Sequence, residues 1–411
     1  MNVNESFACP ICGSLNAMNM LELNCGNFDG SLLYQTVKLN GCLQCGHIFN
    51  MLSPTDRINL MKYYDEEYAP THLGATIKKH DCRKIYDKYA IERYDQVYDL
   101  LSSLINTDAR VLDIGCGMGG FLDYLDAKGI KNLSGIDPSK NYVNFSGEKN
   151  NYTIKLGSAE SIPFDNHYFD LLVMDQVLEH LAEPGRAFQE AKRVLVDGGL
   201  FYIGVPDASR YDTTYFFDFF WFLIREHIQH FDLEHLLMLA EKHGFELVGS
   251  LKNETPIMSE KMMMPNLSVI FRLNGNKKTT QKCFRLVKGI ETYVANELER
   301  LDRKKAAIQQ KLMESQRPVY AWGIGREFLY LYASAGLNKC AISGLIDANP
   351  FKRLNCVVDG KKITDQTILS SAMPNSVLII TAIAHTDAIG SELDMLHYSG
   401  ELSDLLEHNK E

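Results

Sequence analysis

The sequence predicts an α/β protein whose main parallel sheet is preceded by a small cysteine-rich lobe and followed by a second α/β unit. The main sheet is predicted by residues 111–120, where an apolar strand runs into a glycine turn, and by the apolar helix that begins at Phe121. The cysteine-rich lobe is predicted by two C-x-x-C pairs within the first 45 residues. The second unit is predicted by residues 319–328, which repeat the order of strand, glycine turn and helix.

Length and composition limit the possible classes of protein. A chain of 411 residues is long enough for two or three domains of about 100 to 200 residues each. The formal net charge of −10 disfavours a large surface for nucleic-acid phosphates, so no nucleic acid is expected as a partner. No apolar run reaches the ~18 residues of a membrane span, and the N-terminus has no apolar signal region. We therefore expect a soluble cytoplasmic protein without membrane contact.

The N-terminal lobe is predicted to span residues 1–55 and to hold a metal ion. A glycine follows each C-x-x-C pair, and the turn lets two thiolates converge on one ion. Four thiolates in tetrahedral geometry form a closed structural zinc site, which stabilises a lobe too small to bury a sufficient core. The expected zinc ligands are Cys9, Cys12, Cys42 and Cys45, whereas Cys25 and His47 are expected to be packed without binding metal.

A helical connector is predicted over residues 56–106. Apolar and aromatic residues recur there at helical spacing, for example at Tyr94, Tyr98 and Leu101. The helices are expected to lead into the main domain and to cover one side of its pocket. Most tyrosines of the connector are expected to pack, and substrate contact is the alternative for the three nearest to the N-terminal lobe, Tyr63, Tyr64 and Tyr68.

The glycine turn indicates a ligand site but does not identify the ligand. Gly115, Gly117 and Gly119 allow positive φ angles and let a ligand approach the backbone. Asp113 precedes the first glycine and no Lys-Ser/Thr pair follows the last, which argues against a phosphate-binding P-loop. A second predicted strand, residues 132–136, ends at Asp137, about 20 residues beyond the turn, where a carboxylate accepts hydrogen bonds from both hydroxyls of a ribose.

The stretch from Asp113 to Gly119 resembles motif I of class I S-adenosylmethionine-dependent methyltransferases. The resemblance implies a Rossmann-like sheet over residues 107–275, with the ammonium group of the cofactor near Asp113 and its ribose at Asp137. A structural turn in another α/β protein is the alternative. The residues that the resemblance implies for cofactor binding are Asp113, Gly115, Gly117, Gly119, Asp137, Pro138, Ser158, Ala159, Glu160, Asp175, Gln176 and His180.

Later segments match the same family. Residues 157–164 resemble its adenine-binding loop, although Ser158 stands where the family often has aspartate, so Ala159 or Glu160 would supply the contact to adenine. Residues 169–175 form the predicted fourth strand, whose end faces the cofactor and the methyl group. Some relatives bind a divalent metal at this end through a glutamate that Gln176 replaces here, so no catalytic metal is expected. Residues 198–206 resemble the next turn and the fifth strand.

A candidate base follows an aromatic stretch at residues 211–222, which is expected to pack, to cover a ligand or to line a surface between domains. Residues 225–231 resemble the Glu-His-x-x-Tyr/His-Phe signature of sugar methyltransferases. Methyl transfer to oxygen or carbon requires removal of a proton, which suits an imidazole. We predict His227 as the catalytic base with Glu226 and His230 in support. If this turn is helical, the two histidines share one face. A purely structural histidine is the alternative.

The remaining segments complete the main domain and predict a second one. A helix over 233–243 and strands over 244–248 and 267–271 close the main sheet. Within 276–317, a polar linker at 277–281 precedes a long amphipathic helix over 284–312, which would brace two domains or support dimerisation. Residues 318–411 add strands at 342–346 and 377–380 and resemble the C-terminal Rossmann-like module of nucleotide-sugar C-methyltransferases. Phe328 replaces the third glycine of a dinucleotide site, so bound NAD is not expected.

The order of these parts resembles that of nucleotide-sugar and deoxysugar methyltransferases over nearly the whole chain. The resemblance implies a Rossmann-like class I methyltransferase sheet with an N-terminal zinc-binding lobe and a second Rossmann-like C-terminal domain. It implies methyl transfer from S-adenosylmethionine to a nucleotide-linked deoxysugar, with carbon favoured over oxygen, as in deoxysugar and polysaccharide biosynthesis, by a monomer or homodimer. Two alternatives stay open, namely an RNA methyltransferase that grips RNA with its zinc lobe and a non-catalytic nucleotide-sugar binding protein.

Overall fold

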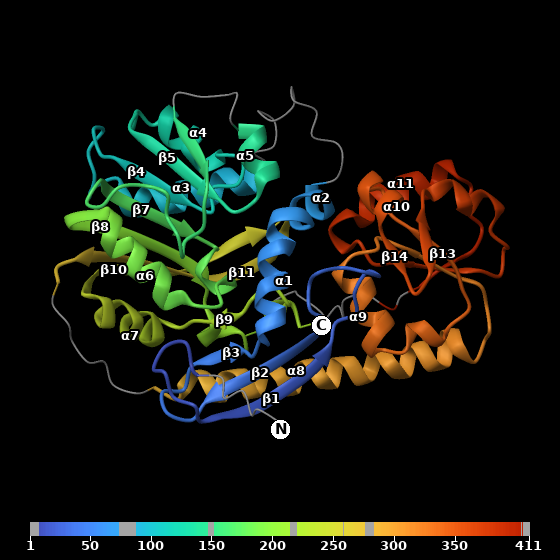
Figure 1. Cartoon of the computed structure of the whole chain (residues 1–411). Coiled ribbons are helices and arrows are strands. Elements are labelled where there is room, and N and C mark those ends of the chain that lie inside the picture. Colours follow the sequence, from blue (N-terminus) through green and yellow to red (C-terminus); the bar gives the residue numbers. More distant parts are fainter. Residues whose placement is uncertain are drawn as a thin grey trace.

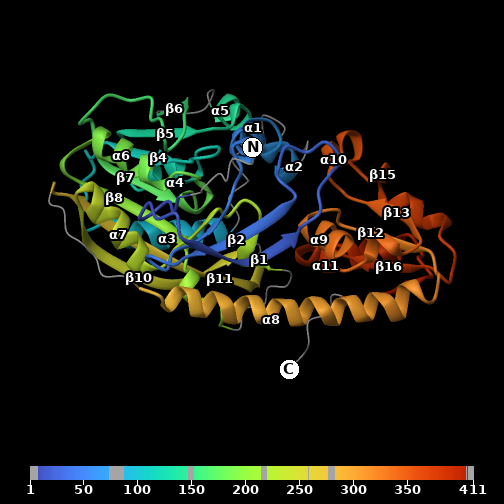
Figure 2. The same ribbon diagram turned by 60° about the horizontal axis from the view of Figure 1, so that its bottom comes forward.

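The computed structural model describes residues 8–73, 88–146, 152–213, 220–257, 259–275, 283–403 and 405. Their strands form three sheets, in the N-terminal lobe, the main domain and the C-terminal unit. Figure 1 shows the main domain and the C-terminal unit side by side, and Figure 2 shows helix α8 (Arg285–Ile308) running beneath both. The predicted linker at 277–281 and part of the predicted aromatic stretch, 214–219, lie outside the described residues.

The main sheet has the strand order β10-β11-β8-β7-β4-β5-β6. Strands β4 to β8 are parallel, and β10 and β11 form an antiparallel hairpin that pairs with β8. The chain moves outward from β4 to β6 and returns on the other side of β4 with β7, so the order reverses between β4 and β7. Ligands of open α/β sheets bind at such a point, beyond the carboxyl ends of the strands. The strands are β4 (Val111–Ile114), β5 (Leu133–Asp137), β6 (Thr153–Leu156), β7 (Phe169–Asp175), β8 (Leu195–Pro206), β10 (Phe245–Ile257) and β11 (Ser259–Leu273).

Helices cover both faces of the main sheet, as the apolar runs of its parallel strands predict. Leu112 and Leu172 pack on one face with α6 (Pro184–Val194) and α7 (Leu233–His243). Their neighbours Val111 and Leu171 pack on the other face with α3 (Lys88–Leu101) and α4 (Gly120–Ala127). Helix α5 (Lys140–Ser146) connects β5 and β6. The predicted order of strands and helices in this domain is confirmed.

The N-terminal lobe shares a sheet with the main domain. Its antiparallel strands are β1 (Ala17–Asn24), β2 (Thr36–Cys42) and β3 (Ile48–Asn50), and β3 pairs with β9 (Gln229–His230) of the main domain. Helices α1 (Pro54–Glu66) and α2 (Tyr68–Leu73) follow. At the start of α1, the Ser53 hydroxyl accepts a hydrogen bond from the Asp56 N–H, and the Asp56 carboxylate accepts one from the Ser53 N–H. This capping box fixes the direction in which the chain leaves the lobe.

The C-terminal unit has a sheet with the order β14-β15-β13-β12-β16-β17. Its central strand β12 pairs in parallel with β13 and β16, and the predicted order of strand, glycine turn and helix is present. Gly323 in this turn has a φ of 101°, and a Cβ there would lie 2.5 Å from the Ala382 nitrogen. The elements are β12 (Val319–Trp322), α9 (Arg326–Ser334), β13 (Ile342–Ile346), α10 (Pro350–Asn355), β14 (Val357–Val358), β15 (Lys361–Thr364), β16 (Val377–Ile380), α11 (Thr386–Met395) and β17 (Glu401–Leu402).

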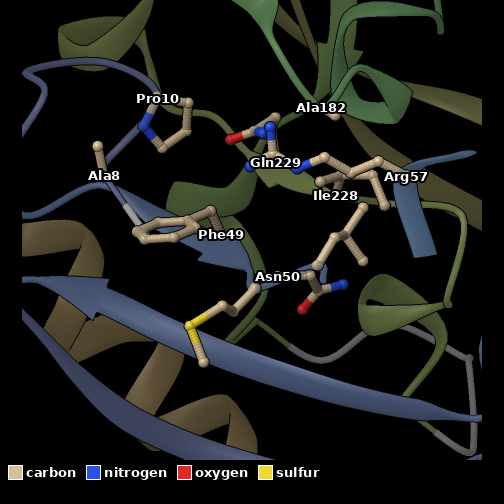
Figure 3. Close-up of a pocket in the computed structure, with 10 residues that line it drawn as sticks. Ala8, Pro10, Phe49, Asn50, Arg57, Ala182, Ile228 and Gln229 are labelled. Carbon is tan, nitrogen blue, oxygen red and sulfur yellow. The ribbon is translucent and has the colours of Figure 1, made fainter. Parts of the chain in front are cut away.

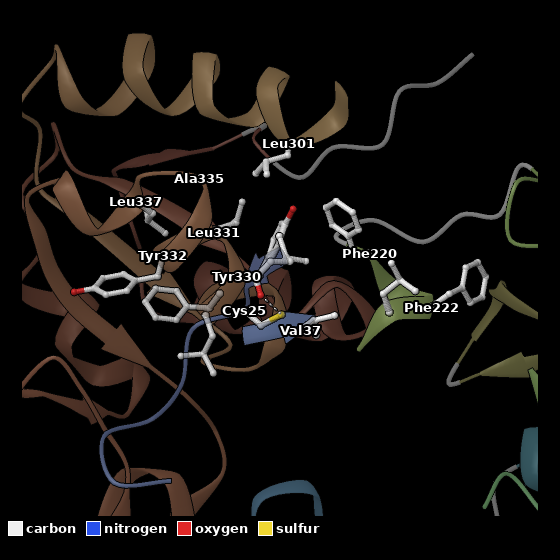
Figure 4. Packing of buried hydrophobic residues seen from close by; sticks show 14 of the residues in the cluster. Cys25, Val37, Phe220, Phe222, Leu301, Tyr330, Leu331, Tyr332, Ala335 and Leu337 are labelled. Carbon is white, nitrogen blue, oxygen red and sulfur yellow. Dashed lines mark hydrogen bonds between the residues drawn. The ribbon is translucent and has the colours of Figure 1, made fainter. Parts of the chain in front are cut away.

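One hydrophobic cluster joins the N-terminal lobe, the main domain and the C-terminal unit. Figure 4 shows in it Val37 of β2, Phe220 of the main domain, Leu301 of α8 and Leu331 of α9. The long amphipathic helix is therefore confirmed, and it braces the parts of the chain, which was one of its two predicted roles. Neither α8 nor any other described helix is long and apolar enough to cross a membrane.

Candidate functional site

The glycine turn lies at the carboxyl end of β4, as predicted. Gly115, Gly117 and Gly119 have φ angles of 77°, 53° and 84°, in the left-handed region that favours glycine. A Cβ on Gly119 would lie 2.7 Å from the hydroxyl oxygen of Tyr152. Gly119 is also the N-cap of α4, so the turn leads into a helix start whose N–H groups lack partners within the helix.

Asp113 lies in β4 with its side chain 6% exposed. Burial raises its pKa to about 8, the carboxylates of Asp175 and Asp137 add to this effect, and Arg93 opposes it. A cation beside Asp113 would favour its charged form and remove this electrostatic cost. The position therefore suits an ammonium group.

Asp137 ends β5, and backbone groups orient both of its oxygens. The Gly117 N–H donates to Oδ2 and the Ser139 N–H donates to Oδ1, each over 2.9 Å. The remaining lone pairs can accept hydrogen bonds from ribose hydroxyls. Burial raises the pKa of Asp137 to about 6, although the two N–H donors oppose the shift, so the group is ionised at neutral pH. The structure brings Asp137 to the glycine turn, and Pro138 is exposed beside it.

The predicted adenine loop follows β6 and forms a tight turn. The Ser161 N–H donates to the Ser158 carbonyl oxygen over 3.1 Å, and the Ser158 N–H donates back over 3.4 Å. Ala159 is buried. The Glu160 carboxylate accepts a hydrogen bond of 3.2 Å from the Glu183 N–H, which ties the loop to the start of α6. Contact of Ala159 or Glu160 with adenine stays a prediction.

The end of β7 places Asp175 next to an arginine that we did not predict. Asp175 Oδ2 lies 2.8 Å from Nε of Arg93, which reaches the site from α3. No motif surrounds Arg93, so no sequence pattern pointed to it. Gln176 follows with a φ of 56°, and its amide nitrogen donates a hydrogen bond of 3.0 Å to Asn266 in β11.

Residues 225–231 do not form a helix. Residues 229 and 230 form strand β9, and the chain before them makes a single short helical turn at Trp221–Leu223. The Ile228 N–H donates to the Glu179 carbonyl oxygen, and the Asn50 side chain donates to the His227 carbonyl oxygen, each over 2.7 Å. The segment is extended because β3 of the N-terminal lobe offers a partner strand, a long-range pairing that local spacing does not reveal.

His230 consequently does not share a helical face with His227. It is 0% exposed, its ring meets the Tyr211 ring edge to face at 6.0 Å, and neither ring nitrogen has a hydrogen-bond partner among the described residues. Burial lowers the pKa of His230 to about 3. These surroundings are typical of a histidine packed in the core. A catalytic role for His230 stays a prediction.

Two imidazoles lie edge to face near the end of β7. The rings of His180 and His227 lie 5.1 Å apart at 66°. Nδ1 of His180 is 2.8 Å from the Glu226 carbonyl oxygen, and Nδ1 of His227 is 3.3 Å from the Phe222 carbonyl oxygen. Because carbonyl oxygens only accept, each neutral ring carries its proton on Nδ1 and keeps a lone pair on Nε2.

A buried carboxylate completes this group. Glu179 is 1% exposed, and neither of its oxygens has a hydrogen-bond partner among the described residues. Burial raises the pKa of Glu179 to about 8, lowers that of His180 and lowers that of His227 well below its usual value. The three side chains offer ligand atoms within 4.8 Å of one another and could hold a metal ion. No catalytic metal was expected because Gln176 replaces a glutamate ligand of some relatives. The three side chains described here offer their ligand atoms without Gln176.

Tyrosines of α1 and α2 lie beside these histidines. The Tyr63 hydroxyl donates to Glu226 Oε1 over 2.9 Å, and the Tyr64 hydroxyl oxygen is 3.1 Å from Nδ1 of His180. The Tyr68 ring is 5.3 Å from the Tyr64 ring. Burial raises the pKa of Tyr63 and Tyr64 well above the usual value, so their hydroxyls remain protonated. The structure therefore brings to the site the three tyrosines for which substrate contact was left open.

The four predicted zinc ligands converge at one point. The Sγ atoms of Cys9 and Cys45 are 3.7 Å apart, those of Cys12 and Cys42 are 3.6 Å apart, and all four lie within 4.8 Å. Tetrahedral thiolates about 2.3 Å from a zinc ion are separated by about 3.8 Å, so the donor set fits zinc. The two other candidates bond elsewhere, as expected: Cys25 to the Leu23 carbonyl oxygen and His47 to the Gln229 side chain.

A small pocket lies where the N-terminal lobe meets the segment after His227 (Figure 3). Phe49 and Asn50 line it from β3, Ile228 and Gln229 line it from the main domain, and Arg57 comes from α1. The pocket adjoins the backbone that holds His227. The candidate site residues at the glycine turn do not line it.

Residues 86–250 match the family model of a methyltransferase domain. This range contains the glycine turn, Asp137, the end of β7 and the His227 segment. The part of the chain that is similar to this family therefore includes the site described above.

Curated relatives match parts of the same domain. An uncharacterized protein of Methanocaldococcus jannaschii is 31% identical over 137 residues, which cover 31% of this chain and 63% of that protein. An uncharacterized methyltransferase of Schizosaccharomyces pombe is 30% identical over 165 residues, covering 36% and 52%. A ubiquinone/menaquinone biosynthesis C-methyltransferase of Campylobacter jejuni is 27% identical over 161 residues, covering 37% and 59%. The chain spans between half and two thirds of the length of these relatives.

Solved structures are similar to less than half of the chain. A SAM-dependent methyltransferase from Methanosarcina mazei has 21% identity and a TM-score of 0.36, covering 45% of this chain and 99% of its own. A putative S-adenosylmethionine dependent methyltransferase from Listeria monocytogenes has 17% identity and a TM-score of 0.35, covering 43% and 97%.

Proposed function

We propose that the protein is an S-adenosylmethionine-dependent methyltransferase. The observation that carries this proposal is the Asp137 carboxylate, whose two oxygens are oriented by N–H groups of the glycine turn and of the residue after Pro138. This arrangement suits the two hydroxyls of a ribose. The match of residues 86–250 to a methyltransferase domain supports the same activity. S-adenosylmethionine would supply a methyl group on a positively charged sulfur atom.

The proposed acceptor is a nucleotide-linked deoxysugar. Hydroxyl and imidazole groups of Tyr63, Tyr64 and His180 surround the candidate base, and such groups can hydrogen-bond a substrate rich in hydroxyls. The C-terminal unit adds Arg326, whose guanidinium carbon lies 4.4 Å from the centre of the Trp221 ring. The positive charge of Arg326 contributes to the lowered pKa of His227. A guanidinium group near the site suits the phosphate groups of a nucleotide.

Carbon is proposed as the acceptor atom in preference to oxygen. The order of the N-terminal lobe, main domain and C-terminal unit resembles that of nucleotide-sugar C-methyltransferases. The relative from Campylobacter jejuni is also named a C-methyltransferase, of ubiquinone/menaquinone biosynthesis.

His227 is the proposed general base. Its depressed pKa keeps it neutral at pH 7, and its Nε2 lone pair is free because Nδ1 faces a carbonyl oxygen. Nε2 of His227 would take the proton of the acceptor atom, and S-adenosylmethionine would supply the methyl group that replaces this proton, with its sulfur leaving as a neutral thioether. Glu179 would stabilise the imidazolium that forms. Glu226, next to His227, would support the base by accepting a hydrogen bond from the Tyr63 hydroxyl.

A structural zinc ion is proposed at Cys9, Cys12, Cys42 and Cys45. The four sulfur atoms supply a complete tetrahedral set without an open position. Such an ion would hold the loops that carry β2 and β3, and it would take no part in the methyl transfer.

Replacement of the base tests the proposed function. We expect His227→Ala to bind S-adenosylmethionine normally in calorimetry and to lose at least about a hundredfold in turnover, the usual contribution of a general base. Turnover is measured with labelled cofactor and a panel of nucleotide sugars. His167→Ala, a histidine after the adenine loop whose ring nitrogen faces the Leu195 carbonyl oxygen, is the matched control. Near-normal turnover of His227→Ala would remove the base assignment, and absence of cofactor binding by the unchanged protein would remove the proposed activity.

A further inference from the structure

Four side-chain amides are hydrogen-bonded in a row that begins at the end of β7. Gln176 follows β7, and the other three are Asn266 of β11, Asn253 of β10 and Gln96 of α3. Nε2 of Gln176 donates to Oδ1 of Asn266 over 3.0 Å, and Nδ2 of Asn266 donates to Oδ1 of Asn253 over 3.2 Å. Nδ2 of Asn253 donates to Oε1 of Gln96 over 2.8 Å. These four side chains form an amide network.

The far end of the amide network fixes the direction of every hydrogen bond in it. Nε2 of Gln96 donates over 3.4 Å to the carbonyl oxygen of Glu254, which can only accept. The side-chain oxygen of Gln96 therefore accepts from Asn253, and the same reasoning applies to each amide in turn. If the Gln176 amide turned over, its oxygen would face the Asn266 oxygen, and two acceptors would meet without a proton between them. The amide network thus holds the Gln176 amide in one orientation.

The side-chain oxygen of Gln176 has no partner in the described part of the chain. Nε2 is used by Asn266, whereas Oε1 accepts no hydrogen bond there, and the residue is only half-buried. Gln176 also has a φ of 56°, in the left-handed region. Such a conformation is costly for a residue other than glycine, and it is found mainly where function requires it. These observations indicate a hydrogen-bond acceptor that is presented to a ligand.

The order of the strands separates this amide from the proposed cofactor. The glycine turn and Asp137 follow β4 and β5, which lie on one side of β7. Asn266 pairs with Pro206 at the carboxyl end of β8, on the other side of β7. The side chain of Gln176 therefore extends from the end of β7 toward the end of β8, at the edge where open α/β sheets bind ligands. This part of the edge is left for the acceptor substrate.

We propose that Oε1 of Gln176 accepts a hydrogen bond from a hydroxyl group of the acceptor sugar, and that the other three amides of the network are positioning residues that act through it. This inference rests on the proposed function. Because an amide oxygen accepts and cannot donate, the contact selects a hydroxyl group over a carbonyl group at that place of the sugar.

Kinetics with labelled cofactor and the panel of nucleotide sugars test the contact. We expect Gln176→Met to raise KM for a methylated sugar about three- to tenfold, the usual contribution of one neutral hydrogen bond. The affinity for S-adenosylmethionine, measured by calorimetry, should stay unchanged. An unchanged KM would overturn the proposal, and so would a loss of affinity for the cofactor. If the unchanged protein methylates none of the sugars, the proposed function fails, and this inference fails with it.

A double-mutant cycle tests the positioning residues. Asn253→Leu removes the acceptor of the Asn266 amide, so we expect it to raise KM by no more than Gln176→Met does. In the Gln176→Met background it should have no further effect. Asn253→Asp keeps an oxygen for Asn266 and should recover most of the loss. Additive effects of Asn253→Leu and Gln176→Met would show that Asn253 acts through the fold and would overturn the positioning role, as would no rise in KM.

Asn274→Leu is the matched control for the double-mutant cycle. Its side-chain amide donates to Glu246 at the open end of the β10–β11 hairpin, away from the amide network. We expect it to leave KM for the sugar and the affinity for S-adenosylmethionine unchanged in both backgrounds. A rise in KM equal to that of Asn253→Leu would show that any disturbance of the hairpin has this effect, and it would overturn the positioning role.

Discussion

Asp113 would couple the proposed cofactor site to pH. Its carboxyl group is buried, and its pKa rises from 3.8 to about 8. Because the folded protein holds this proton more tightly than the unfolded chain, the stability that Asp113 contributes is present at acid pH and is lost as the pH rises through about 8. A cation bound beside the carboxylate lowers the pKa again, so binding expels the proton.

We therefore expect the affinity for S-adenosylmethionine to rise with pH up to about 8, by at most about tenfold per pH unit for one released proton. Calorimetry at several pH values, in buffers with different enthalpies of ionisation, measures both the affinity and the number of protons released. Asp113→Asn should bind more weakly and show a smaller slope, because the amide does not ionise. Asp170→Asn, on the same sheet but paired with Arg110, should keep the slope of the unchanged protein. An affinity that is flat over this range would contradict the coupling.

At the residue scale, the sequence identifies the groups that belong to a local pattern. Asp113 and Asp137 follow from the glycine turn and the strand ends, because strand ends of a parallel sheet meet at one edge. Arg93 and Asn50 belong to no such pattern, and only the fold brings them to Asp175 and to His227. The sequence also did not predict that the Glu179 oxygens have no hydrogen-bond partner among the described residues, because burial is a property of the folded chain.

At the scale of elements, β3 and β9 connect the four-cysteine group to His227, the proposed base. β3 begins three residues after Cys45 and pairs with β9, which follows His227 by two residues. The side-chain amide of Asn50 in β3 donates a hydrogen bond of 2.7 Å to the His227 carbonyl oxygen. Loss of order around the cysteines should therefore reach His227 through one short strand pair, while the glycine turn lies on a different sheet.

Cys12→Ser tests this connection. We expect the variant to lose bound zinc, to exchange the amide hydrogens of Gln229 and His230 faster, and to fall in turnover while its affinity for S-adenosylmethionine is kept. Metal analysis, hydrogen exchange and calorimetry measure the three effects. Cys340→Ser, in the C-terminal unit, is the control and should change none of them. Full turnover without zinc would show that the lobe does not position the base.

The elements that were predicted correctly are those with strong local periodicity. Helix α7 occupies residues 233–243 as predicted, and its C-cap is Gly244 with a φ of 87°. The conformation of residues 225–231 could not be predicted, because two histidines three residues apart suit a helical face and also suit a turn followed by a strand. The partner strand β3 lies about 180 residues away in the sequence, and such pairing is not encoded in local spacing.

At the scale of the whole molecule, the N-terminal lobe, the main domain and the C-terminal unit share one hydrophobic cluster. The C-terminal unit contacts the N-terminal lobe at Asp29, whose carboxylate accepts the N–H groups of Asp359 and Gly360, each over 2.9 Å. Helix α8 adds apolar side chains to the cluster that the lobe and the C-terminal unit also form. The amphipathic face of α8 could be predicted from the spacing of its apolar residues. What covers that face could not be predicted, since a second copy of the chain and a second domain both offer an apolar surface.

The shared core predicts how the molecule unfolds. Ile308 at the end of α8 is 0% exposed within the common cluster. Truncation of a buried isoleucine to alanine leaves a cavity and costs about 2–5 kcal/mol. Because the cavity lies in a core that several parts share, Ile308→Ala should lower the stability of all of them together and keep one cooperative transition. Leu298→Ala, on the same helix but 40% exposed, should change the stability by no more than about 0.5 kcal/mol.

The two tryptophans of the chain allow this to be measured at separate places. Trp221 precedes the His227 segment, and Trp322 is in β12 of the C-terminal unit, 3% exposed. Denaturant unfolding is followed by fluorescence in Trp221→Phe and Trp322→Phe, each with and without Ile308→Ala, so that each protein reports from one tryptophan. We expect both tryptophans to report the same denaturant midpoint and the same shift of that midpoint on Ile308→Ala. The reason is that α8 packs in the cluster that the main domain and the C-terminal unit share. A shift seen only by Trp322 would mean that the C-terminal unit unfolds by itself and that α8 belongs to it alone.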